Sequence, residues 1–239
     1  MTIDKTMEKK RYITFDKRLI EAFAALGFKR KNQDTFLRMQ NEALQRIGFT
    51  HSVHGERHVK YYNLSLYVEY PKVNELIKSL QYDYYDFDGF QINIGYLKEN
   101  PKFQQYRVAD EDNDETVLRV IENMAHDVEH YGLPFFDKYS TIDAAIKGME
   151  THEITFTALS VKRSLPVFYL SKGWPESALS YVNSREEQEI KGYEKQVAEC
   201  LELRKLHGDD NVEMPPSRFH QDYIRFANLI REYVNGHAR

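Results

Sequence analysis

The sequence predicts an α+β fold: an antiparallel sheet of four or five strands with helices on one face, followed by a helical C-terminal part. Residues 62–70 alternate between apolar and more polar side chains, and this period of two indicates a strand with one buried face. One-sided strands are typical of antiparallel sheets. Strand-like segments come early in the chain and helix-like segments late, which also indicates the α+β class. The buried parity is predicted to hold Tyr62, Leu64, Leu66, Val68 and Tyr70.

The first 70 residues are predicted to form one helix and then three strands. Residues 16–26 carry an apolar stripe at helical spacing, and Gly27 is a typical helix end. The basic residues 29–31 fit a charged helix exit. Residues 35–39, 44–53 and 59–70 then read as strands. The polar connection at residues 53–57, with its single glycine, suits a hairpin between the last two.

Pro71 is expected to begin a helix, because proline is tolerated in the first helical turn. Residues 73, 76, 77 and 80 would form its apolar face. Residues 90–96 alternate again and predict a further strand.

From about residue 110 the pattern becomes helical. An acidic connector leads into a helix at 116–131, and Thr141 is positioned to cap another. Residues 154–158 fit either a strand or a helix start. Ser184 begins a capping box that predicts the start of a long helix, and residues 215–217 are predicted to start the last one. We therefore expect a sheet portion at 1–110 and a helical portion at 111–239 packed against it, or one continuous domain.

Composition narrows the function classes. The formal net charge is −4, from 33 basic and 37 acidic residues, so no global charge favours binding to nucleic acid or an anionic membrane. Cys200 is the single cysteine, which fits a reducing cytoplasm. The first residues contain no apolar signal-peptide region, and no apolar run reaches the roughly 20 residues that span a bilayer. We expect a cytoplasmic protein.

Three histidines lie around the predicted hairpin: His51, His54 and His58. Imidazoles this close in sequence could bind a metal or another ligand, and His51 and His58 could face each other across the hairpin. The alternative is an ordinary polar turn. We treat the three as candidate binding residues.

His126 to His130 match the H-x-x-E-H pattern of the inverted zinc proteases, in which two histidines one helical turn apart bind zinc beside a glutamate. The apolar stripe of that helix contains Ile121, Met124 and Val128. The histidines lie roughly 140–180° from it at 100° per residue and should therefore face solvent. They remain weak metal candidates, and we predict no cofactor.

Residues 168–181 are similar to the junction between two helices of a tetratricopeptide repeat, with a glycine turn followed by Ala178 and Tyr181. A single unit of this kind is best interpreted as a helical hairpin. Trp174 would lie at its turn, either as an anchor for a partner or as a lid on the hairpin.

Several segments resemble a bacterial family named for a domain of unknown function, DUF4304. The resemblance rests on Leu26-Gly27-Phe28 with the basic residues after it, on residues 35–38 and 47–52, and on the later segments 90–95 and 131–137. It covers about residues 13–150. It implies an opening helix, an aromatic strand and a sheet, and it brings no activity and no functional residues.

The leading hypothesis is a non-catalytic binding protein, one version being an immunity-type or accessory protein that masks a bacterial protein partner. Mild acidity, the 17 tyrosines and the lack of a catalytic motif favour it. One alternative is a metal-assisted hydrolase that uses a histidine cluster. Another is a small-ligand pocket between sheet and helices lined by Tyr62, Tyr67 and Tyr84. The oligomeric state is left open.

Overall fold

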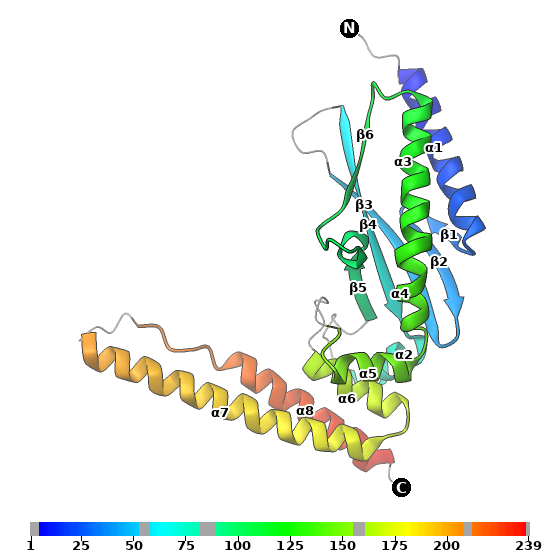
Figure 1. Ribbon diagram of the computed structural model, residues 1–239. Coiled ribbons are helices and arrows are strands. Elements are labelled where there is room, and N and C mark those ends of the chain that lie inside the picture. The colour runs from blue at the N-terminus through cyan, green and yellow to red at the C-terminus, as the bar shows by residue number, and fades with distance from the viewer. Residues whose placement is uncertain (1–4, 53–57, 82–88, 155–160, 208–211, 238–239) are drawn as a thin grey trace. The chain divides into compact units, whose positions relative to one another are not determined.

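A computed structural model of the 239-residue chain describes residues 5–52, 58–81, 89–154, 161–207 and 212–237 (Figure 1). Contacts divide the chain into two compact units. The first contains Met1–Pro71 and Asp88–Ala158, and the second contains Lys72–Phe87 and Leu159–Arg239.

The first unit is built on a six-stranded sheet whose paired strands are all antiparallel. The strands follow each other in the order β1 to β5, and β6 pairs with the part of β4 that β5 leaves open. This confirms the α+β class and the antiparallel sheet. The strands are β1 (Lys29–Asn32), β2 (Thr35–Gln40), β3 (Ala43–Ser52), β4 (Val59–Glu69), β5 (Gly89–Asn93) and β6 (Gln105–Ala109).

Strand β4 has one buried face, as its alternation predicts. Leu64, Leu66 and Val68 are all 0 % exposed, whereas Ser65 and Tyr67 between them are half-buried. Leu66 lies opposite Ile47 of β3, which is also fully buried. The pleat therefore directs every second side chain of both strands into one core.

Helices α1 (Lys5–Ala25) and α3 (Asp114–Asp127) lie side by side over the same face of the sheet (Figure 1). The ring of Phe23 in α1 lies 5.0 Å from that of Phe36 and 5.6 Å from that of Phe49, centroid to centroid. Gly27 follows α1 at φ +85°, a left-handed conformation in which glycine avoids the steric cost of a side chain. The chain can therefore turn directly from α1 into the sheet.

Two strands were missed by the sequence analysis. Residues 29–31 form most of β1 and are not only a charged helix exit, because the two-residue turn Gln33-Asp34 brings them back along β2. β1 is an edge strand, where lysines are common because they discourage pairing with other chains. β6 has only five residues, and the alternation of its first four, Gln-Tyr-Arg-Val, is a short strand signal.

The remaining elements of the first unit begin close to their predicted positions. β5 ends at Asn93 and is followed by the short 3₁₀ helix η2 (Ile94–Leu97), so the predicted strand 90–96 is too long. Asn113 caps α3 by accepting a hydrogen bond from the Thr116 N–H at 2.8 Å. A π-helical turn, η3 (Val128–Gly132), joins α3 to α4 (Leu133–Lys138). Thr141 caps α5 (Ile142–Glu150), as predicted.

The second unit is helical where it is described. Its helices are α2 (Pro71–Ser79), α6 (Val161–Ser171), α7 (Pro175–His207) and α8 (Arg218–His237). The prediction that a helix begins at Ser184 is wrong, because α7 starts at Pro175 and continues through Ser184. Helices α6 and α7 form the predicted hairpin around Gly173, which has φ +76°. α8 runs back along α7, and Arg231 of α8 donates hydrogen bonds to Asn183 and Glu186 of α7.

Among the helices that the structure describes, no candidate for a membrane span is found.

Leu66→Ala tests the buried face of β4. We expect it to lower the free energy of unfolding by about 2–5 kcal/mol, because a fully buried leucine leaves a cavity when it is truncated. Met39→Ala in β2, where the side chain is 58 % exposed, is the control and should change stability by less than about 0.5 kcal/mol. Urea denaturation followed by circular dichroism measures both. Similar small losses in the two variants would contradict the buried face.

Candidate functional site

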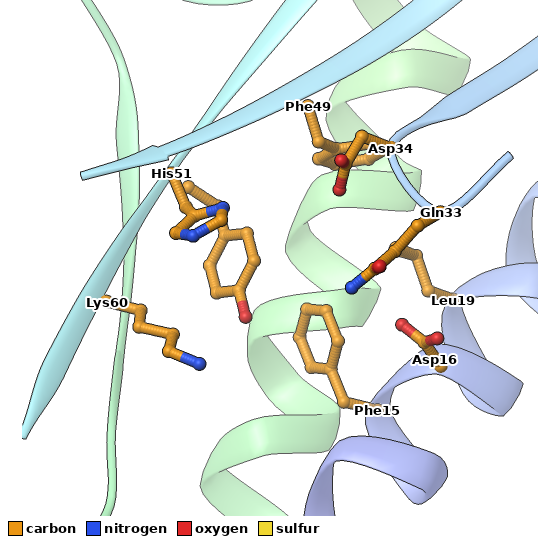
Figure 2. A pocket seen from close by; sticks show the side chains of 9 residues that line it. Phe15, Asp16, Leu19, Gln33, Asp34, Phe49, His51 and Lys60 are labelled. Atoms are coloured by element: carbon orange, nitrogen blue, oxygen red, sulfur yellow. The ribbon is translucent and has the colours of Figure 1, made fainter. Parts of the chain in front are cut away.

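A pocket of about 280 Å³ opens between α1 and one end of the sheet (Figure 2). Four segments that are distant in sequence meet there: α1, the turn between β1 and β2, and the facing ends of β3 and β4. The residues that line it are Phe15, Asp16, Leu19, Gln33, Asp34, Phe49, His51, Lys60 and Tyr62.

The register of β3 and β4 explains why the pocket lies at this end. Phe49 lies opposite Leu64, and His51 lies opposite Tyr62, so all four belong to the core-facing side of the sheet. Toward this end of the strands the core-facing residues change from apolar to polar: Leu64 is followed outward by Tyr62 and then by Lys60. The hydrophobic core therefore ends in a partly polar opening.

The floor of the pocket is apolar and aromatic. Phe15, Leu19 and Phe49 are 7 %, 5 % and 8 % exposed, so each is held firmly by the core while one surface faces the pocket. The Phe15 ring stacks on the Tyr62 ring, with centroids 5.1 Å apart and planes at 22°. His51 lies 6.3 Å from the same tyrosine ring. Such a surface can stack against a flat or apolar ligand.

An ion pair fixes the turn between β1 and β2 against α1. The Arg30 guanidinium donates to the Asp16 carboxylate at 2.9 Å and to the backbone carbonyls of Asn32 and Gln33 at 2.9 and 3.2 Å. These bonds hold together two of the segments that line the pocket. The charge of Asp16 is thereby balanced within the protein.

The backbone N–H and carbonyl of Asp34 both form hydrogen bonds, which fix the position of this residue. Its N–H donates to the Asn32 side chain at 3.0 Å, and its carbonyl accepts from the Phe49 N–H at 2.8 Å. No ion pair to its exposed carboxylate is found among the residues that the structure describes. Figure 2 shows Asp34, Gln33 and Asp16 on one side of the pocket and Lys60 on the other. The rim thus carries opposite charges on opposite sides.

The two hairpin histidines that the structure describes, His51 and His58, do not converge. His51 lines the pocket, whereas His58 Nδ1 lies 3.1 Å from the Asp110 carboxylate. The expectation that His51 and His58 face each other is wrong, since the residue opposite His51 is Tyr62 and His58 precedes β4. His54 lies outside the described residues, as does Tyr84.

Tyr62 and Tyr67 do not share a pocket. They have opposite parity in β4, so they lie on opposite faces of the sheet. On its face, the Tyr67 ring lies 3.4 Å from the Arg46 guanidinium, and its hydroxyl accepts from Gln91 at 2.9 Å. Trp174 belongs to the second unit, where it is 42 % exposed and its ring lies 6.2 Å from that of Tyr169. Its role as anchor or lid stays a prediction.

His126 and His130 are exposed, as the position of the apolar stripe indicated. Their rings stack on each other with centroids 3.9 Å apart, and the Nδ1–H of His130 donates to the His126 carbonyl at 2.9 Å. Within the described ranges, no group of three or more histidine, cysteine or carboxylate side chains is arranged to hold a metal ion.

A buried polar cluster lies beside these histidines and was missed by the sequence analysis. Asp127 is 7 % exposed, and its Oδ2 accepts from Lys98 Nζ at 2.6 Å and from the Tyr106 hydroxyl at 2.5 Å. Burial, the hydrogen bond to Asp127 and the negative charge of Asp127 raise the pKa of Tyr106 far above its ordinary value. Asp127 is the residue next to His126, but it points inward, and the cluster ties η2 and β6 to α3.

Comparison with known families gives one match. The model of the family described as "Domain of unknown function (DUF4304)" matches residues 19–138, which is half of the chain. This span contains every pocket residue except Phe15 and Asp16. Comparisons with curated proteins and with solved structures give no match.

Tyr106→Phe tests the buried cluster through pH. Above the ordinary tyrosine pKa of about 10, the unfolded chain loses the Tyr106 proton and the folded chain keeps it, so this phenol's contribution to stability is lost as the pH rises. The stability advantage of the unmodified protein over Tyr106→Phe should therefore shrink by about 1.4 kcal/mol per pH unit above that point. Urea denaturation between about pH 8 and 11 measures it.

Tyr96→Phe, at a phenol that is 47 % exposed, controls for the loss of a hydroxyl as such. A stability difference between the protein and Tyr106→Phe that does not change over this pH range would contradict the cluster.

Proposed function

We propose that this chain, which belongs to the DUF4304 family, is a binding protein without chemistry of its own, and that its ligand is a small molecule bound in the pocket of the first unit. The observation that carries the proposal is the pocket itself, in which an apolar and aromatic floor meets polar and charged side chains at the rim. In small-molecule sites, apolar contact supplies affinity and polar groups supply orientation.

The volume fits this proposal. At about 280 Å³, the pocket is close to the lower end of the range of roughly 300–1,000 Å³ that is typical of ligand sites. A metabolite of one ring with short substituents is therefore a suitable occupant. The rigid floor of Phe15, Leu19 and Phe49 would lose little conformational freedom when such a ligand binds.

Binding is favoured over metal-assisted hydrolysis by the positions of the histidines. Among the described residues, His51, His58 and the pair His126 and His130 lie at three separate places and have different neighbours. A hydrolytic zinc needs about three protein ligands that converge on one point. The described histidines do not provide that set.

A protein partner is the second candidate, as expected for an immunity-type or accessory protein in a bacterial cytoplasm. The observation that favours it is the last part of α7, where Leu201, Leu203 and Leu206 are 45 %, 45 % and 77 % exposed. Leu203 and Leu206 are three residues apart and share one face of α7, and adjoining exposed apolar side chains are a common feature of interaction surfaces. Such a partner could bind the second unit while the pocket of the first unit holds a small ligand.

A thermal-shift screen of small aromatic metabolites tests the proposal. A ligand that binds only the folded protein stabilises it by about 2.7 kcal/mol at a hundred times its Kd, which is enough to raise the unfolding temperature by several degrees. We expect hits with the unmodified protein and none with Tyr62→Ala, because Tyr62 forms one wall of the pocket.

Tyr61→Ala is the matched control, since Tyr61 is adjacent in β4 but has the opposite parity. It should keep every hit. Hits that survive Tyr62→Ala, or a screen in which no compound raises the unfolding temperature of the unmodified protein, would overturn the proposal.

A further inference from the structure

We infer that the ligand of the pocket is a small zwitterion with an aromatic or apolar body, whose amine binds at Asp34 and whose acid group binds at Lys60. This inference rests on the proposed function and adds the chemical class of the ligand. Three features carry it: the two signs of charge at the rim, their separation across the sheet, and the aromatic floor between them.

The two charges come from different parts of the sheet. Asp34 precedes β2, Lys60 lies near the start of β4, and β3 runs between these two strands. Neighbouring strands are about 4.8 Å apart, and successive residues in a strand rise by about 3.3 Å. Asp34 is level with Phe49, and Lys60 lies four residues beyond Leu64, the partner of Phe49, so the two backbones are roughly 16 Å apart. Between them lie Phe49 and His51 of β3 (Figure 2). A single small ion is too short to contact both charged groups.

The acidic side of the pocket keeps a net negative charge. Asp16 is neutralised by Arg30 at 2.9 Å, whereas the Asp34 carboxylate is paired with none of the described cations. Gln33 adds an amide on the same side. An ammonium group placed there would gain a carboxylate partner. Asp34 is therefore the group that would select an amine.

The basic side selects the other end of the ligand. Lys60 is half-buried, and it shares the core-facing side of β4 with Tyr62. An ammonium group at the edge of a partly apolar pocket favours a carboxylate or a similar anion, since reduced exposure to water strengthens the attraction. His51 is on the same face and can hydrogen-bond to the ligand's acid group or to its body.

The body of the ligand is set by the floor. Phe15, Leu19 and Phe49 offer only carbon atoms, so the middle of the ligand must be apolar to avoid burying unpaired polar groups. The stacked Phe15 and Tyr62 rings give the pocket aromatic surface, which favours a ring in the ligand. The structure thus combines a ring site with two opposite charges beyond its ends.

Calorimetric titration with three matched probes tests the inference: para-(aminomethyl)hydrocinnamate, which has both charges, hydrocinnamate, which has only the acid, and para-ethylbenzylamine, which has only the amine. With the unmodified protein, we expect the zwitterion to bind at least about tenfold more tightly than either singly charged probe, since it alone makes both charge-assisted contacts.

Two variants test which residue binds the amine of the ligand and which binds its acid group. In Asp34→Asn, the zwitterion should bind no more tightly than hydrocinnamate, and in Lys60→Gln no more tightly than para-ethylbenzylamine. Glu75→Gln and Lys102→Gln remove one exposed charge of each sign at positions that do not line the pocket, and they should leave all three affinities unchanged.

The outcomes separate the inference from the proposed function. Equal affinity for the three probes, or a preference that neither pocket variant changes, would overturn the inference. If none of the probes binds but aromatic hits that depend on Tyr62 exist, the inference fails and the proposed function stands. If neither the probes nor any aromatic compound binds, both fail.

Discussion

Strand β4 is the element on which the first unit depends. It pairs with β3 along one edge and with both β5 and β6 along the other, so four of the six strands meet through it. Its core-facing side chains are fully buried from Leu64 to Val68. Because side chains alternate in a strand, a shift of one residue in its register would send these apolar side chains to the opposite face. The apolar period of β4 therefore fixes the register of the whole sheet.

The pocket is a consequence of where that period ends. The core-facing positions of β4 stay apolar from Val68 to Leu64 and then become Tyr62 and Lys60. Helix α1 continues over this end of the sheet and contributes Phe15 and Asp16. The turn before β2 completes the wall, held to α1 by the bonds of Arg30. The sheet and α1 thus enclose an apolar core along the middle of β4 and leave a partly polar pocket at the end of that strand.

Much of the fold could be predicted because it depends on local period. The alternation of residues 62–70 predicts the strand, its buried face and the antiparallel class of the sheet. The side chain of Thr141 likewise predicts the start of α5, because it caps that helix. β1 was not predictable in this way, because three of its four residues are charged and only the turn at Gln33-Asp34 pairs it with β2. Ser184 carries a capping pattern, but it lies inside α7, where packing against α8 continues the helix.

The candidate site was less accessible to sequence reasoning. His51 and Tyr62 were both named as candidates, but their meeting depends on the register between β3 and β4. Tyr62 and Tyr67 were placed in one pocket, although the period of two already puts them on opposite faces of the strand. Asp34 and Lys60 had no distinguishing signal, because a charged residue in a turn or at a strand end is usually solvated. Only the tertiary fold places them around one aromatic floor.

The most direct test of the account is the reactivity of single cysteines introduced along β4 in a Cys200→Ser background. Cysteines at positions 64, 66 and 68 should react slowly with a water-soluble maleimide, because these positions are fully buried, whereas those at 63, 65 and 67 should react faster. A cysteine at position 62 should react although it shares the buried parity, because Tyr62 faces the pocket. Equal reactivity along the strand, or protection at position 62 as strong as at 64, would contradict the account.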